Sequence, residues 1–190
     1  MMKEIRWHGR GGQGAKTVSE LLALALLKSG YFVQAFPEYG PERSGAPIRA
    51  YTRSSDQPIR LHCGVTNPDI VIVLDASLLN DTDITEGLES NGLVLVNTPL
   101  DAEAIKSSLE RLTNLYCLDA DRLAEETGCS FSNVVMVGAV SSINGAPALE
   151  MLYEAAEEKL GAKLSPEQLQ INKDAIEAGY NALKDMEEMV

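Results

Sequence analysis

The stretch W-H-G-R-G-G-Q-G-A-K-T at residues 7–17 is the most informative part of this chain. Lys3–Trp7 has the pattern of a short strand, and Ala15–Lys28 has the pattern of a helix. Gly9, Gly11 and Gly14 satisfy the G-x-G-x-x-G spacing of a loop that joins a first strand to a first helix. The stretch therefore predicts an α/β fold with a glycine-rich loop at the end of its first strand.

Each glycine has an expected role in such a loop. We expect Gly9 to allow the tight turn, Gly11 to let the backbone approach a ligand, and Gly14 to let helix and strand pack closely. The first N–H groups of the helix and its positive dipole end then favour an anion over the loop. The predicted ligand contacts lie in and just after this loop: Gly9, Arg10, Gly11, Gly12, Gln13, Gly14, Lys16 and Thr17.

Two common nucleotide-binding loops fit this spacing imperfectly. A Walker A loop needs Lys directly after its second Gly, whereas Ala15 stands between Gly14 and Lys16. A dinucleotide site needs an acidic residue about 20 positions after the glycines, at the end of the second strand. Glu38 lies in that neighbourhood, although we expect it in a proline-flanked loop. A freestanding Rossmann-type dehydrogenase that binds NAD remains the alternative function.

Composition and charge exclude several classes of protein. The 190 residues suit one domain, and no apolar run approaches the roughly 18 residues of a membrane span. The formal net charge of −12 is unevenly distributed along the chain. Residues 1–60 carry nine Lys and Arg against five Asp and Glu, whereas residues 61–190 carry seven Lys and Arg against 23 Asp and Glu. The acidic remainder argues against nucleic acid and anionic membranes as partners. The start of the chain lacks a signal-peptide pattern, so we expect a cytoplasmic protein.

The chain offers little chemistry of its own. Cys63, Cys117 and Cys129 are scattered, and the two histidines, His8 and His62, stand apart from them. Zinc and iron–sulfur sites need about four clustered ligands, so we expect no metal site and no catalytic residue in this chain. A binding and assembly subunit is favoured over a self-contained enzyme.

A rigid loop and a β-hairpin are expected after the first helix and a second strand at Tyr31–Phe36. The loop A-F-P-E-Y-G-P-E-R-S-G-A-P at 35–47 is rich in proline and glycine, which is typical of a functional surface. Ile48–Arg53 alternates, with Arg49 and Arg53 on one face, and we expect it to pair with Pro58–Cys63. The predicted partner-binding residues lie in the loop: Glu38, Tyr39, Glu42 and Arg43.

The rest of the chain alternates apolar strands with helices. Continuous apolar runs predict buried parallel strands at 69–75, 92–97 and 115–118. Helices are expected from 76, at 101–112 and 121–127, at 133–143 with Asn133 as its N-cap, and at 147–160 and 166–187. The pattern predicts a doubly wound, Rossmann-like parallel sheet in a single α/β domain (1–190), with an inserted hairpin (48–63) and a helical C-terminal segment (147–190).

Several motifs together resemble one family. The glycine stretch at 7–17, F-P-E-Y-G-P-E-R-S-G-A-P at 36–47 and P-D-I-V-I-V-L-D at 68–75 are similar to the gamma subunit of 2-oxoacid:ferredoxin oxidoreductases, above all its pyruvate and 2-ketoisovalerate branches. N-V-V-M-V-G-A at 133–139 and I-N-x-x-A-I-E-A-G-Y at 171–180 extend the resemblance over nearly the whole chain. Ser44 departs from the pattern, since many relatives carry a second Arg after Arg43.

The resemblance implies a subunit that is inactive alone. Such complexes decarboxylate a 2-oxoacid, here pyruvate, oxidatively with thiamine diphosphate, pass electrons through iron–sulfur clusters to ferredoxin, and form an acyl-CoA. The implied partners are the thiamine-binding and iron–sulfur subunits, with ferredoxin reached through the complex. The phosphates of CoA are then the leading candidate for the anion at the glycine loop. In a third interpretation the chain is a purely structural assembly protein whose loop holds no ligand.

Overall fold

Six strands form one mixed sheet in the computed structural model, which describes residues 2–38, 45–106, 109 and 114–188, with side chains to Lys184. The strand order is β2-β3-β1-β4-β5-β6. Strands β1, β4, β5 and β6 run parallel, whereas β3 is antiparallel to both of its neighbours, β1 and β2. The bounds are β1 Met2–Arg10, β2 Phe32–Glu38, β3 Pro47–Ser55, β4 Ile70–Val73, β5 Leu93–Asn97 and β6 Asn114–Leu118.

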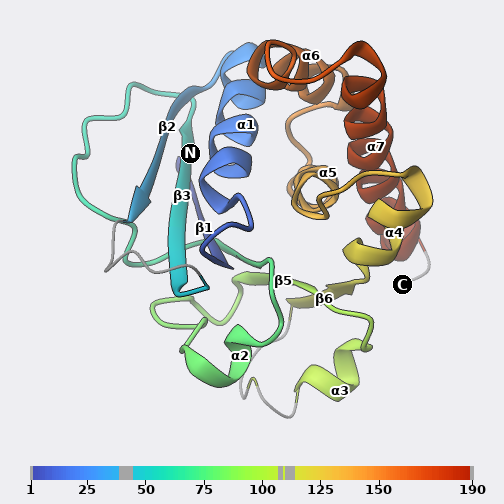
Figure 1. Cartoon of the computed structure of the whole chain (residues 1–190). Coiled ribbons are helices and arrows are strands. Elements are labelled where there is room, and N and C mark those ends of the chain that lie inside the picture. Colours follow the sequence, from blue (N-terminus) through green and yellow to red (C-terminus); the bar gives the residue numbers. More distant parts are fainter. Residues whose placement is uncertain (1, 39–44, 107–108, 110–113, 189–190) are drawn as a thin grey trace.

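Helices cover both faces of the sheet, which confirms the doubly wound α/β architecture (Figure 1). Along β4, Ile70 and Ile72 join the larger apolar cluster, whereas Val71 and Val73 join a smaller cluster on the opposite face. The short helices α2 (Leu78–Asp81) and α3 (Ala102–Lys106) cover the smaller cluster. The larger one is covered by α1 (Ala15–Lys28), α4 (Ala120–Thr127), α5 (Asn133–Asn144), α6 (Leu149–Leu160) and α7 (Pro166–Glu188).

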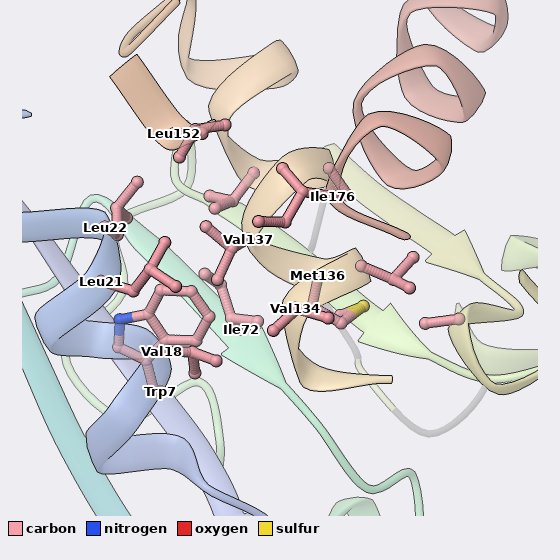
Figure 2. Packing of buried hydrophobic residues seen from close by; sticks show 14 of the residues in the cluster. Trp7, Val18, Leu21, Leu22, Ile72, Val134, Met136, Val137, Leu152 and Ile176 are labelled. Atoms are coloured by element: carbon pink, nitrogen blue, oxygen red, sulfur yellow. The ribbon is translucent and has the colours of Figure 1, made fainter. Parts of the chain in front are cut away.

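Helix α5 lies at the centre of the larger cluster (Figure 2). It is buried from Val134 to Ser141, between the sheet, α1 and α7. A Cβ added to Gly138 would lie 1.9 Å from the carbonyl oxygen of Ile176, and one added to Gly179 would lie 2.0 Å from that of Val135. These two glycines therefore let the backbones of α5 and α7 touch.

The antiparallel half of the sheet has one polar face. Ile5 and Trp7 of β1 belong to the larger apolar cluster, so the alternate residues of β1 face the other way. Three cross-strand rows form this second face, which we call the polar ladder. Its rows are Glu4–Arg53–Gln34, Arg6–Tyr51–Phe36 and His8–Arg49–Glu38, each written in the order β1, β3, β2.

The predicted hairpin partner Pro58–Cys63 is wrong, because this segment forms no strand. It is held to the polar ladder through its carbonyl groups instead: Gln34 Nε2 donates to Leu61 O at 2.9 Å, and Arg53 Nη2 donates to Cys63 O at 3.3 Å. Pro58 also has no N–H to donate to a strand ladder. The segment therefore covers polar side chains rather than extending the sheet.

The partner of β3 is β2, and the two form the antiparallel pair from Phe32↔Ser55 to Glu38↔Arg49. The predicted alternation of Ile48–Arg53 is confirmed, with Arg49 and Arg53 on one face. Glu38 is the last residue of β2 and not, as expected, part of a loop. Tyr39, Glu42 and Arg43 lie outside the described residues.

Helix boundaries differ from expectation at a few positions. Asn133 is the first residue of α5 rather than its N-cap, which is Ser132. The helix expected at 101–112 is described as α3 over Ala102–Lys106, and 107–108 and 110–113 lie outside the described residues. The helical C-terminal segment is confirmed as α6 and α7. Within the described ranges, no helix combines the length and the apolar character needed to cross a membrane.

Candidate functional site

A cavity opens where the chain turns in opposite directions from two adjacent parallel strands. From β1 the chain leads through α1 to β2 on one side, and β4 lies on the other side of β1. The carboxyl ends of such strands diverge and leave a crevice, which is where open α/β sheets bind ligands. Here the crevice lies between the glycine loop and Leu74–Ser77, and its volume is about 470 Å³.

A second hollow of about 340 Å³ adjoins this crevice. The two share Gly12, Ser130, Phe131 and Asn133, and Phe131 is 59% exposed. We call the first the polar cavity and the second the apolar groove. The polar cavity is lined by Gln13, Asp75, Ser77, Asn97 and Asp121, and the groove by Thr17, Val134, Leu160, Leu164 and Ile171. The pair offers a polar end and an apolar end to one elongated ligand.

The glycines of the loop divide their roles differently from expectation. Gly12 has φ of 100° and Gly14 has φ of 75°, so these two, and not Gly9, make the turn. Gly9 is the close-packing position instead, because a Cβ there would lie 3.3 Å from Leu74 Cδ1 and 3.4 Å from Ala15 Cβ. A Cβ on Gly14 would lie 2.4 Å from Asn133 Nδ2. The loop therefore packs against α5 as well as against Leu74, directly after β4.

Some loop amides are already bonded within the protein. The N–H of Gly11 donates to Ala46 O at 2.9 Å, and the N–H of Arg10 donates to Gln13 Oε1 at 2.7 Å. The first turn of α1 differs, because its N-cap Gly14 supplies no side-chain acceptor. N–H groups in a first helical turn have no intrahelical acceptor. The exposed residues Lys16 and Thr17 lie in that turn, which makes it the part of the loop best able to hold an anion.

Arg10 is bound within the protein. Its guanidinium donates to Asp81 Oδ2 at 2.6 Å and to Ser77 Oγ at 2.8 and 3.0 Å, and its Nε lies 3.5 Å from Asp75 Oδ2. It also donates to Gly45 O at 3.3 Å. Arg10 thus joins the glycine loop to the region after β4, and an anion would have to compete with two carboxylates for its charge.

Asp75 organises the opposite wall of the polar cavity. Its Oδ2 accepts from Gln13 Nε2 at 2.8 Å, and its Oδ1 accepts from the N–H and the hydroxyl of Ser77 at 3.0 and 2.6 Å. Burial alone would raise the pKa of Asp75, but the hydrogen bonds from Ser77 and Gln13 hold it below its usual value. Asp75 therefore carries a negative charge at neutral pH and repels a second anion from this wall.

His8 faces away from the cavity, in the polar ladder. Its Nε2 accepts from Arg6 Nε at 3.0 Å, and it is only 2% exposed. Burial, followed by the charges of Arg6 and Arg49, lowers the pKa of His8 to about 3. His8 is thus a neutral structural residue, and His62 is exposed on the segment after β3.

Sequence reasoning missed Asn97 and the connection from α4 to α5. Asn97 Nδ2 lies 3.2 Å from both Leu74 O and Asp121 Oδ2, and its Oδ1 accepts from the N–H of Ala120 at 2.9 Å. It ties together the ends of β4 and β5 and the start of α4. A polar residue that closes the apolar run G-L-V-L-V-N was the available signal. Asn133 Nδ2 donates to Gln13 O at 2.8 Å, a contact across 120 residues that no local pattern reveals.

The remaining predicted residues are placed as follows. Glu38 is exposed at the end of β2, and its carboxylate accepts from the hydroxyl of Tyr51. The pKa of Tyr51 is raised to about 12, first by burial and second by the hydrogen bond to Glu38.

The three cysteines differ in burial: Cys63 is exposed, Cys117 is half-buried and Cys129 is buried. Among the described residues, no three His, Cys, Asp or Glu gather as metal ligands would.

Comparison with known proteins gives one consistent result. The family model for pyruvate ferredoxin/flavodoxin oxidoreductase matches residues 4–182. The chain is 43% identical over 182 residues to "Pyruvate synthase subunit PorC" of Thermotoga maritima, covering 95% of this chain and 94% of that protein. It is 42% identical to "Pyruvate/ketoisovalerate oxidoreductases common subunit gamma" of Thermococcus kodakarensis, covering 95% and 96%.

The crystal structure of the pyruvate oxidoreductase subunit PORC of Thermotoga maritima is similar over nearly its whole length. It superposes with a TM-score of 0.81 at 39% identity, covering 95% of this chain and 96% of that one. Fold and sequence therefore point to the same relatives.

Proposed function

Because the chain belongs to the pyruvate ferredoxin/flavodoxin oxidoreductase family, among its gamma subunits, we propose that it works in a complex that oxidises pyruvate. The complex decarboxylates the 2-oxoacid, transfers the acyl group to CoA and passes two electrons to ferredoxin. The chain acts as an assembled subunit and has no turnover alone. We place the complex in the cytoplasm.

The alternative, a freestanding NAD-dependent dehydrogenase, is not favoured. In a dinucleotide fold, the acidic residue that binds the ribose closes the strand next to the glycine loop. Here β3 stands between β1 and β2, so Glu38 ends a strand two positions away from β1. Its carboxylate is also engaged by Tyr51.

The proposed role of the site is to hold the phosphates of CoA at the first turn of α1. The observation that carries this proposal is the junction of the polar cavity with the apolar groove beside an uncapped helix N-terminus. Lys16 and Thr17 add a charge and a hydroxyl at that turn. Asp75 and Asp121 line the far side of the cavity, so the phosphates would lie toward Lys16. The groove would then receive the less polar arm of CoA.

The other cofactors are assigned to partner subunits. The three cysteines lie on separate segments and, within the described residues, do not provide a ligand set for an iron–sulfur cluster. We propose that thiamine diphosphate and the clusters lie on subunits that dock at the end of β2. Glu38 is placed there, and Tyr39, Glu42 and Arg43 follow it in the chain.

Steady-state kinetics of the reconstituted complex test the CoA site. Lys16→Ala should raise the KM for CoA about tenfold, which corresponds to ~1.4 kcal/mol, and leave the KM for pyruvate unchanged. Lys106→Ala is the matched control, since it removes an exposed lysine on the opposite face of the sheet. An unchanged KM for CoA in a fully assembled Lys16→Ala complex would leave the loop with a packing role alone.

A separate measurement tests the subunit assignment. The purified chain, supplied with pyruvate, thiamine diphosphate and CoA, should not reduce viologen. Addition of the thiamine-binding and iron–sulfur subunits should restore activity. Robust turnover by the isolated chain would contradict the assignment, whatever the result with Lys16→Ala.

A further inference from the structure

The polar ladder contains a buried cation that no carboxylate contacts within the described residues. Arg6 is 2% exposed, and its Nε and Nη2 donate to His8 Nε2 at 3.0 Å and to Ile84 O at 2.9 Å. Both acceptors are neutral, since His8 is unprotonated. Buried charges in proteins are normally paired with an opposite charge.

The charges around Arg6 offset its burial only in part. Burial, and then the like charge of Arg49, lower the pKa of Arg6, whereas the carboxylates of Glu86 and Asp83, which form no ion pair with it, act in the opposite direction. Arg53, the neighbouring arginine of the ladder, shows the usual arrangement, because its Nε donates to Glu4 Oε1 at 2.6 Å. Arg6 therefore differs from Arg53 in lacking a counter-ion at contact distance.

A recess of about 380 Å³ lies over this part of the ladder. Arg6, Arg49 and Tyr51 supply polar groups to its lining, and Phe36, Pro37 and Val65 supply apolar ones. Among the described residues, no protein acceptor binds the Nη1 of Arg6. No side-chain nitrogen or oxygen atom of the described residues is both fully buried and without a hydrogen bond. Nη1 is thus not fully buried, and Arg6 lines the recess.

We propose that this recess binds a small carboxylate, which supplies the missing counter-ion of Arg6. One carboxylate oxygen would accept from Nη1 of Arg6 and the other from the guanidinium of Arg49. The pair between Arg49 and Glu86 is long, at 3.4 Å, and Glu86 is 64% exposed, so Arg49 exchanges this partner readily. The apolar wall fits a short hydrocarbon body behind the carboxylate.

Depth and charge favour a free small molecule over other anions. Arg6 is too deeply placed for a broad surface to reach, which argues against an acidic side chain presented by a partner subunit. Glu38 and Glu86 at the lining repel a multiply charged phosphate more than a singly charged carboxylate. This site lies on the face of the sheet opposite α1, apart from the cavity proposed for CoA.

Thermal unfolding of the purified chain tests the proposal with acetate and propionate as probes, against chloride at equal ionic strength. At about ten times the Kd, the carboxylate should raise the Tm by about 3–5 °C. Arg49→Gln should remove most of this shift, and Arg6→Met should remove all of it. Arg122→Gln, at an exposed arginine of α4 on the other face, should keep the full shift.

Two outcomes would overturn the proposal. An equal shift in all variants would show a general salt effect, and no shift in the wild-type chain would show that the recess takes no free carboxylate. Should Arg6→Met fail to fold, Arg49→Gln at the half-buried rim decides the test alone. Loss of copurification with the partner subunits in Arg49→Gln, without any carboxylate effect on the isolated chain, would reject the free ligand in favour of a docked acidic side chain.

Discussion

Strands β4 and β5 bury valine, isoleucine and leucine on both faces, whereas β1 and β3 bury two arginines and a histidine on one of theirs. The difference follows from what covers each half. Helices lie on both sides of β4 and β5, but the polar ladder is covered in part by the irregular segment 58–63. A segment without regular structure must bond its backbone groups to side chains. The buried polar groups of the ladder supply those bonds.

The largest expected effect comes from breaking the ion pair between Glu4 and Arg53. Glu4→Met should lower the free energy of unfolding by about 3 kcal/mol, because Arg53 is only 1% exposed and would lose its carboxylate. Urea denaturation measures this loss. The double variant Glu4→Met with Arg53→Met should recover most of it, since both charges are then gone. Glu126→Ala, which breaks an exposed pair with Arg122, should change stability by less than about 0.5 kcal/mol.

A double variant no more stable than Glu4→Met would contradict this account. The ladder would then depend on the shapes of these side chains rather than on their paired charges.

The next effect is a pH dependence confined to the polar half. The pKa of His8 is about 3 in the folded chain against 6.5 for an ordinary histidine. Stability from neutral His8 is complete above pH 6.5 and is lost as the pH falls, because only the unfolded chain takes up the proton. Between pH 8 and pH 5 the loss should be about 2 kcal/mol.

His8→Gln is the variant that isolates this effect, since glutamine keeps an acceptor for Arg6 but does not titrate. The difference in unfolding free energy between wild type and variant should shrink by the same amount from pH 8 to pH 5. A difference that stays constant over this range would show that His8 is protonated in the folded chain.

The smallest expected effect sharpens the description of the parallel half. Ile72→Val and Ile105→Val each remove one buried methylene, from the larger and the smaller apolar cluster respectively. Each should cost about 1 kcal/mol, with no change between pH 5 and pH 8. Equal costs would mean that the short helices α2 and α3 bury their face as effectively as the five longer helices bury theirs. A negligible cost for Ile105→Val would show that the smaller cluster is loosely packed.

The sequence predicts the parallel half well and the antiparallel half poorly. D-I-V-I-V-L-D and G-L-V-L-V-N are apolar without interruption, and such runs have few structural interpretations other than buried strands. The alternation of Ile48–Arg53 also predicted its two faces correctly. Its partner was predicted wrongly as Pro58–Cys63, because pairing depends on which segment folds back, and the strand predicted at Tyr31–Phe36 is of the same length.

The candidate site likewise has one part that the sequence predicts and one part that it does not. The glycine loop and its place between strand and helix follow from local spacing. The bond from Asn133 to Gln13 O and the engagement of Arg10 by Asp75 and Asp81 join residues 65 to 120 positions apart. Periodicity carries no information on such contacts, so Arg10 looked free in the sequence.

The contact between α5 and α7 has a consequence for how the chain is made. Helix α7 follows α5 in the chain and covers it, so the central helix of the larger cluster is synthesised before the helix that packs on it. At synthesis rates of about 5–20 residues per second, its 23 residues take about 1–5 s to appear. Until then α5 lacks the cover that α7 gives to the apolar stripe around Gly138. A chain interrupted before α7 is complete would therefore leave an apolar helix uncovered, and exposed apolar surface of this kind promotes aggregation.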